Sequence, residues 1–323
     1  MSTDELYMAR CLQLALNGEI GAPPNPMVGA VIVHDDRIIG EGYHARCGEA
    51  HAEVNAFRSI CNESLLPDST LYVSLEPCAH YGKTPPCADL IVCKGVKRVV
   101  VGCADPFPRV QGRGIQRLRD AGIDVTVGVL EQESLALNRR FITFHTHHRP
   151  YVTLKWAQTA DGVIGEKELG VKFQISNSKF QRTVISTSAT LRRVHHLRAT
   201  HSAILVGWRT NEMDRPALTT RHYSGPNPVR IIYDSHAQTL PQLMAELYDR
   251  GLQSLLVEGG AATLRQFIDA SLWDEIHQEV GASPFGGDKS LALYAPDISH
   301  LSPDETIRIG SHTIRRYYAK LTP

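Results

Sequence analysis

Two cysteines bracket the segment Pro77-Cys78-Ala79-His80-Tyr81-Gly82-Lys83-Thr84-Pro85-Pro86-Cys87, and His51-Ala52-Glu53 stands upstream of it. Imidazole and thiolate groups suit Zn²⁺, and three protein ligands leave a fourth tetrahedral position for water. Zinc lowers the pKa of such a water towards ~7, and a nearby carboxylate that does not bind the metal can move protons. The pattern therefore predicts a catalytic zinc site with His51, Cys78 and Cys87 as ligands and Glu53 as the proton carrier. Together these groups could hydrolyse the bond between an amino group and an amidine-like ring carbon.

The spacing of the two cysteines leaves an alternative open. His-x-Glu followed by Pro-Cys-x-x-Cys is a zinc-deaminase signature, whereas here eight residues separate the cysteines rather than two. The alternative is a closed structural site, with His44, His80 or Cys93 as a fourth ligand and Glu53 merely exposed on its helix. Structural zinc sites usually show paired short cysteine spacings and need no adjacent carboxylate, so the pattern favours catalysis.

Composition and charge limit the partners of this chain. Its 323 residues contain 34 Lys plus Arg and 34 Asp plus Glu, without the basic excess that binding to a phosphate backbone needs. No uncharged apolar run approaches the ~18–20 residues that span a bilayer. Asp4 and Glu5 precede an amphipathic run whose apolar positions are Leu6, Ala9, Leu12, Ala15 and Leu16. This pattern predicts a surface helix rather than a signal peptide. We therefore expect a cytoplasmic enzyme without nucleic-acid or membrane partners.

The distribution of residue types indicates two domains. All seven cysteines precede residue 104, and all three tryptophans follow residue 150. Strand-like runs alternate with helix-period runs through the first half, and the same α/β rhythm restarts at Tyr151. Between the halves, residues 145–150 read as an irregular linker, and no cysteine or carboxylate pattern accompanies the linker's histidines. The sequence therefore predicts one domain over residues 1–146 and a second over residues 147–323.

The segment between the two cysteines, with Pro24-Asn25-Pro26-Met27-Val28-Gly29-Ala30 and His51-Ala52-Glu53, closely resembles the bifunctional riboflavin-biosynthesis deaminase–reductase family, RibD. The resemblance covers nearly the whole chain and is most specific in residues 20–130. It implies an N-terminal cytidine-deaminase-like three-layer α/β domain and a phosphoribosylated diaminopyrimidinone substrate. By the family pattern, the pyrimidine or its ribose contacts Asn25 and His44, and the ribose and phosphate contact His80, Lys83 and Thr84. Asp105 falls where the family contacts the ribose, although Phe107 stands where a polar residue is expected.

From Tyr151 the chain resembles the reductase half of the same family, which implies a C-terminal dihydrofolate-reductase-like α/β domain and NADPH as the cofactor. The motifs are Lys155-Trp156-Ala157-Gln158-Thr159-Ala160-Asp161-Gly162 and Val257-Glu258-Gly259-Gly260. A strand that ends in two glycines before a helix lets backbone amides approach a cofactor phosphate. The resemblance implies substrate contacts at Arg198, Leu218, Arg221 and Glu258. It implies cofactor contacts at Ala157, Thr210, Asp214, Gly259 and Gly260.

The second half also departs from the family pattern. Arg215 precedes Pro216, where relatives usually carry Asp or Asn, and Lys172-Phe173-Gln174-Ile175-Ser176 replaces a Ser-x-Trp-Ile-Thr stretch. Two hypotheses about this half follow. In the leading one, the chain deaminates 2,5-diamino-6-(5-phosphoribosylamino)pyrimidin-4(3H)-one and then reduces its ribosyl group to a ribityl group with NADPH. In the other, the second half is a binding or assembly module beside a monofunctional pyrimidine deaminase.

A nucleic-acid base deaminase is a third hypothesis for the chain, and the balanced charge argues against it. The resemblance also implies a homo-oligomer, a dimer or tetramer formed through the reductase domain.

Overall fold

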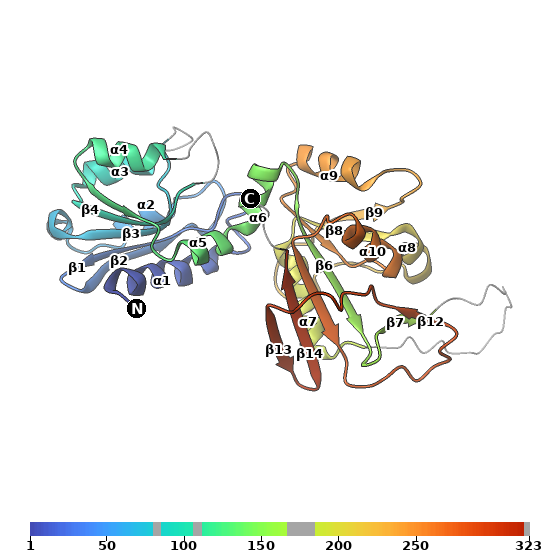
Figure 1. The fold of residues 1–323 in the computed structure, drawn as a ribbon. Coiled ribbons are helices and arrows are strands. Elements are labelled where there is room, and N and C mark those ends of the chain that lie inside the picture. The colour runs from blue at the N-terminus through green and yellow to red at the C-terminus, as the bar shows by residue number, and fades with distance from the viewer. Residues whose placement is uncertain (80–84, 106–111, 167–184, 320–323) are drawn as a thin grey trace. The chain divides into compact units, whose positions relative to one another are not determined.

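The computed structural model describes residues 1–79, 85–105, 112–166 and 185–319, and the chain divides into two compact units, Met1–Arg149 and Pro150–Pro323 (Figure 1). Helix α6 (Arg139–His147) belongs to the first unit. The expected irregular linker at 145–150 was therefore wrong for its first three residues, which are helical, and the expected boundary after residue 146 falls inside α6. The predicted substrate contacts His80, Lys83 and Thr84 lie outside the described ranges, as do three residues that depart from the family pattern: Phe107, Lys172 and Gln174.

The first unit contains a five-stranded mixed sheet in the order β2-β1-β3-β4-β5. β1 is antiparallel to both of its neighbours, whereas β3, β4 and β5 are parallel. β2 was not expected, and it forms an edge of the sheet. The strands are β1 (Gly29–His34), β2 (Arg37–Tyr43), β3 (Thr70–Leu75), β4 (Arg98–Cys103) and β5 (Asp124–Val127).

Helices cover both faces of this sheet, so the unit has three layers, as predicted (Figure 1). Side chains alternate between faces along a strand. Ala30 and Ile32 of β1 therefore pack in one core with α2 (Ala52–Arg58), α3 (Cys87–Lys94) and α4 (Arg113–Asp120). Val31 and Val33 pack in the other core, with α1 (Thr3–Ala15), on the face that α5 (Glu131–Leu137) also covers. Short 3-10 helices occupy Leu16–Gly18 and Glu63–Asp68.

Helix α1 forms where an amphipathic helix was expected, but its buried face differs from the expected one. Leu6 and Leu16 are 56% exposed, whereas Tyr7, Met8, Cys11 and Leu14 are buried against the sheet. The capping box between Ser2 and Glu5 sets where the helix begins. Of the predicted apolar positions only Ala15 is fully buried, because the buried face of α1 also uses the ring of Tyr7, the thioether of Met8 and the thiol of Cys11.

The second unit is built on a seven-stranded sheet in the order β13-β14-β11-β6-β10-β8-β9, and β11 to β9 run parallel. β13 and β14 extend one side as an antiparallel hairpin. β7 (Val163–Glu166) and β12 (Ala292–Tyr294) form a separate two-stranded sheet. The main-sheet strands are β6 (Tyr151–Gln158), β8 (Ala203–Gly207), β9 (Val229–Tyr233), β10 (Ser254–Val257), β11 (Glu275–Val280), β13 (Glu305–Ile309) and β14 (His312–Tyr318).

Helices lie on both faces of the second sheet as well. α9 (Leu240–Asp249) and α10 (Ala261–Asp269) pack in the larger core, and Leu197 of α7 (Ser188–Thr200) packs with Leu256 in the smaller one. α8 (Trp208–Asp214) follows β8 directly. Because parallel strands end at a common edge, the residues that follow β6, β8 and β10 gather there, which is the usual ligand position in such sheets. Within the described ranges, no helix is both long and apolar enough to cross a membrane.

Candidate active sites

The three predicted zinc ligands converge in the first unit. Their ligand atoms, His51 Nδ1, Cys78 Sγ and Cys87 Sγ, all lie within 4.8 Å of one another. His51 Nδ1 is 3.6 Å from Cys78 Sγ and 3.3 Å from Cys87 Sγ. Bond lengths of about 2.1 Å to nitrogen and 2.3 Å to sulfur put tetrahedral ligand atoms about 3.6–3.8 Å apart, so this cluster fits a zinc ion with little adjustment.

Helix ends and backbone hydrogen bonds position the ligands. His51 is the N-cap residue of α2, and Cys87 is the first residue of α3. The Cys87 backbone N–H donates to Cys78 Sγ at 3.3 Å. Hydrogen bonds from Cys87 and His51 lower the pKa of the Cys78 thiol, which favours the thiolate that metal binding requires. Within the described ranges, the cluster consists of these three ligands, and neither His44 nor Cys93 joins it; His80, the other fourth ligand of the structural-zinc alternative, lies outside those ranges.

Glu53 lies in the first turn of α2, two residues after His51, and is 3% exposed. Burial, followed by the charge of Cys78, raises the pKa of Glu53 to about 6. A carboxyl group with such a pKa can accept and release a proton near neutral pH. Glu53 is therefore not the solvent-exposed helix residue of the structural-zinc alternative.

Asn25 and His44, two of the predicted substrate contacts, lie next to each other and close to the ligand His51. The Asn25 side-chain amide lies 3.1 Å from His44 Nε2, and His44 Nδ1 lies 3.1 Å from the Ala50 carbonyl oxygen. The carbonyl can only accept, so Nδ1 carries the proton and Nε2 accepts from Asn25. The His44 and His51 rings stand edge to face with centroids 5.3 Å apart. Burial lowers the pKa of His44, which favours its neutral form.

Asp105, the predicted ribose contact, is buried at the end of the segment that follows β4. Its backbone N–H donates to Glu76, a residue that the sequence reasoning did not single out. Glu76 directly follows β3 and directly precedes Pro77-Cys78. A carboxylate at the end of a buried strand needs hydrogen-bond partners. The position of Glu76 directly after a buried strand was therefore the one sequence signal that could have identified it.

In the second unit, Arg198 and Glu258 form a two-pronged ion pair. Arg198 Nε donates to Glu258 Oε1 at 2.8 Å, and Arg198 Nη2 donates to Glu258 Oε2 at 2.7 Å. Arg198 Nη1 also donates to the Thr219 carbonyl at 3.1 Å. Both residues are predicted substrate contacts, and the structure brings them together. The guanidinium is thus held by protein acceptors on two sides.

The neighbouring loop positions Leu218 and Arg221. The Arg221 backbone N–H donates to Nδ1 of the buried His195 at 2.8 Å. Burial, followed by the charge of Arg198, lowers the pKa of His195 to about 4, so at neutral pH it is the neutral acceptor that this bond needs. Leu218 is buried at φ +54°, a region that side chains with a Cβ rarely adopt. A residue keeps such a backbone conformation only where packing and hydrogen bonds from the surrounding structure hold it there. His195 was not anticipated.

The predicted cofactor residues lie around the C-terminal ends of β6, β8 and β10. A Cβ on Gly259 would come within 2.8 Å of the Thr263 side chain, and one on Gly260 within 3.0 Å of Thr210 Oγ1. Gly260 is the N-cap residue of α10. Ala157 is half-buried in β6, and Asp214 is exposed at the end of α8. A Cβ on Gly259 would therefore force Thr263 to move, whereas one on Gly260 would make only a tight contact. The N-terminal N–H groups of α10, which begins after Gly260, are of the kind that bind phosphates.

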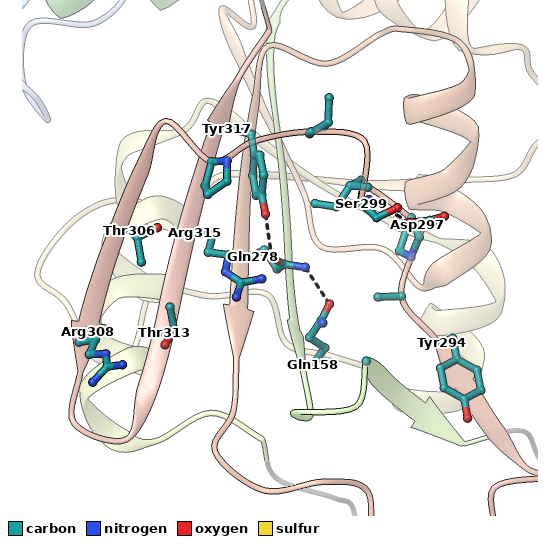
Figure 2. A pocket seen from close by; sticks show the side chains of 16 residues that line it. Gln158, Gln278, Tyr294, Asp297, Ser299, Thr306, Arg308, Thr313, Arg315 and Tyr317 are labelled. Atoms are coloured by element: carbon teal, nitrogen blue, oxygen red, sulfur yellow. Dashed lines mark hydrogen bonds between the residues drawn. The ribbon is translucent and has the colours of Figure 1, made fainter.

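A pocket of about 800 Å³ lies elsewhere in the second unit (Figure 2). Gln278 Nε2 donates to Gln158 Oε1 at 3.1 Å, and the Tyr317 hydroxyl donates to Gln278 Oε1 at 3.1 Å. Arg308 and Arg315 project from the neighbouring hairpin. None of the predicted reductase contacts, all of which the structure describes, lines this pocket.

Comparisons with known proteins identify the family of each unit. Residues 1–103 match the family model of the cytidine and deoxycytidylate deaminase zinc-binding region, and residues 150–313 match that of the RibD C-terminal domain. The chain is 34% identical to the riboflavin biosynthesis protein RibD of Aquifex aeolicus (strain VF5), over 95% of this chain and 93% of that protein.

Two solved structures resemble nearly the whole chain. Acinetobacter baumannii RibD, form 1, has a TM-score of 0.84 at 31% identity, covering 98% of each chain. A Thermotoga maritima diaminohydroxyphosphoribosylaminopyrimidine deaminase/5-amino-6-(5-phosphoribosylamino)uracil reductase has a TM-score of 0.81 at 34% identity, covering 97% of this chain and 98% of that one. A zinc-ligand cluster in a deaminase-like unit is thus joined to a RibD-type reductase unit, and the chain belongs to the RibD family of bifunctional riboflavin-biosynthesis deaminase–reductases.

Proposed function

We propose that the N-terminal unit deaminates 2,5-diamino-6-(5-phosphoribosylamino)pyrimidin-4(3H)-one and that the C-terminal unit reduces the ribosyl group of the product to a ribityl group. The observation that carries the proposal is the convergence of His51, Cys78 and Cys87 beside the buried Glu53. A structural zinc site does not require such a carboxylate. The names of the T. maritima relative and the RibD relatives supply the substrate class.

In the deaminase, each residue has a distinct task. His51, Cys78 and Cys87 hold the zinc ion, which when bound activates water for attack on the amino-bearing ring carbon. Glu53 accepts the proton that the water loses and delivers it to the departing amino nitrogen, so that ammonia leaves. Asn25 and His44 hold the pyrimidine or its ribose. His80, Lys83, Thr84 and Asp105 are assigned to ribose and phosphate by the family pattern.

In the reductase, Ala157, Thr210, Asp214, Gly259 and Gly260 hold NADPH, which supplies the reducing equivalent when bound. The predicted substrate contacts of this unit bind the ribosyl phosphate of the substrate. Among them, Arg198 and Glu258 form a rigid ion pair, and Arg221 offers a guanidinium suited to a phosphate. Leu218 shapes the floor of the site. The substrate contacts assigned here are Arg198, Leu218, Arg221 and Glu258.

The proton carrier is tested with Glu53→Gln in the full-length protein. We expect zinc content at the wild-type level and loss of ammonia release, because the amide cannot accept the proton. Glu133→Gln, on an exposed position of α5, is the control and should behave as wild type. A Glu53→Gln enzyme that keeps its zinc and its rate would remove Glu53 from the mechanism.

The same variant tests the second half-reaction. When Glu53→Gln is given the already deaminated product, it should oxidise NADPH at the wild-type rate, since the reductase site is intact. When it is given the original substrate, it should oxidise none. Failure of the wild-type protein to oxidise NADPH with the deaminated product would instead favour a non-reducing C-terminal module.

We also propose a cytoplasmic homo-oligomer, formed through the reductase unit, that does not bind nucleic acid. All seven cysteines are free thiols, and exposed ones such as Cys47, Cys61 and Cys93 suit a reducing compartment. Zero formal charge argues against a nucleic-acid partner. Light scattering after size exclusion measures the oligomeric state, and a gel shift at physiological salt tests polynucleotide binding. A monomer or a retained polynucleotide would contradict these assignments.

A further inference from the structure

Glu76 is a buried carboxylate, 4% exposed, that accepts four backbone hydrogen bonds. Its Oε2 accepts from the N–H groups of Asp105 at 3.1 Å and Gly112 at 2.9 Å. Its Oε1 accepts from the N–H groups of Gly114 at 2.8 Å and Ile115 at 3.3 Å. Every one of these donors lies at least 29 residues away in the sequence. One side chain therefore ties together three separate segments of the unit.

These segments border the zinc site. Glu76 is joined through Pro77 to the ligand Cys78, and its own N–H donates to the Cys103 carbonyl at 3.0 Å. Gly114 lies so close that a Cβ there would stand 1.9 Å from the Pro77 carbonyl oxygen. The first turn of α4 and the chain at Asp105 are thus both held against the backbone that carries Cys78.

Only a carboxylate satisfies all four donors. It has two acceptor oxygens with about four lone-pair sites, whereas a carboxamide has one acceptor oxygen and turns an NH₂ group towards the other pair of N–H groups. Hydrogen bonds to a charged acceptor are also roughly twice as strong as neutral ones. The geometry therefore requires the charge as well as the length of glutamate.

We propose that Glu76 is a positioning residue of the deaminase, which holds Asp105 at a set distance from Cys78 so that the ribose of the substrate meets the Asp105 carboxylate while the pyrimidine ring meets the zinc site. This inference rests on the proposed deaminase function and on Asp105 as a substrate contact. Glu76 itself does not touch the substrate. Its effect must therefore be on substrate affinity, while the chemical step at Glu53 and the metal is spared.

The test is Glu76→Gln in the full-length protein, with Glu133→Gln as the matched exposed control. We expect the KM for deamination to rise by about tenfold, the factor for losing one well-placed hydrogen bond to the substrate. The kcat and the zinc content should stay at wild-type levels. Hydrogen exchange should accelerate at one pair of amides, either Asp105 with Gly112 or Gly114 with Ile115. NADPH oxidation with the deaminated product is the internal control and should not change.

An unchanged KM despite faster amide exchange would show a purely structural role and overturn the proposal. So would a fall in kcat and zinc content at an unchanged KM. Should Glu76→Gln fail to fold, Asp105→Ala still decides, because a wild-type KM in that variant would leave Glu76 with nothing to position. If both variants fold, their KM effects should not add in the double variant. Absence of ammonia release in the wild type would instead refute the proposed deaminase function.

Discussion

The ion pair between Arg198 and Glu258 yields the sharpest prediction for the reductase unit. Their side chains are 11% and 13% exposed, and two charge-assisted hydrogen bonds of 2.8 and 2.7 Å join them. Removing one partner of a buried pair typically costs about 3–5 kcal/mol, because the other charge remains buried. Glu258→Gln keeps one acceptor oxygen, so we expect about 3 kcal/mol, the lower end of that range.

That loss converts into a measurable shift. A unit of this size moves its midpoint by about 2–4 °C per kcal/mol, which gives about 6–12 °C for Glu258→Gln. Calorimetry of the full-length protein is the assay, because the transition of the deaminase unit serves as an internal reference. Glu246→Gln is the matched control: Glu246 pairs with Arg250 at 3.0 Å, but both are over 40% exposed. Such a pair contributes about 0–1 kcal/mol, so its loss should move the midpoint by little.

The double variant Arg198→Met with Glu258→Gln tests the reasoning itself. Removing both charges leaves no buried ion without a partner, so the double variant should be less destabilised than the sum of the single variants. A shift under about 2 °C for Glu258→Gln, or additive single variants, would refute the claim that this pair is a buried structural unit. In that case the role of Arg198 and Glu258 would be limited to binding the substrate.

Three further predictions concern the rest of the molecule. The pKa of His195 falls from an unfolded value near 6.5 to about 4, so the unfolded chain binds more protons in that window, and the stability of the reductase unit falls as pH drops from about 6.5 to 4. His195→Gln should flatten this dependence in calorimetric scans, and parallel curves would contradict the assignment. Removing zinc with a chelator should lower the midpoint of the deaminase unit alone, because only that unit holds the ligand cluster within the described chain; equal shifts in both units would contradict a single zinc site. Gly114→Ala should displace the Pro77 carbonyl and lower the free energy of unfolding of the deaminase unit by about 1–3 kcal/mol. Gly286→Ala, with open space around it, is the control and should leave stability unchanged in calorimetry. Equal stabilities of the two variants would refute the predicted close contact.

Much of the fold was predictable because buried strands and helices repeat their apolar residues with fixed periods. The sequence carries strand-like apolar runs at Leu71–Leu75, Ala203–Val206 and Ser254–Val257, and the structure forms β3, β8 and β10 there. The prediction missed strands β2, β7, β12 and β13. Strand β2 contains Gly40 and Gly42, and a Cβ on either would collide with α2 or with the chain just after it. The glycines are therefore explained by close contact with a helix, and they lower the strand propensity from which β2 could have been predicted.

The sequence by itself predicted the chemistry of the zinc site, because few residue types bind zinc and the segment from Pro77 to Cys87 resembles that of one family. Only the tertiary structure decided what supports that chemistry. Glu76 accepts hydrogen bonds from backbone N–H groups, which every residue but proline carries. The identity of these donors therefore cannot be predicted from the residue types in the sequence. Arg198 and Glu258 are 60 residues apart, and their pairing depends on how α7 crosses the sheet at the end of β10. Contacts made across such separations depend on packing, and packing depends on the whole chain at once.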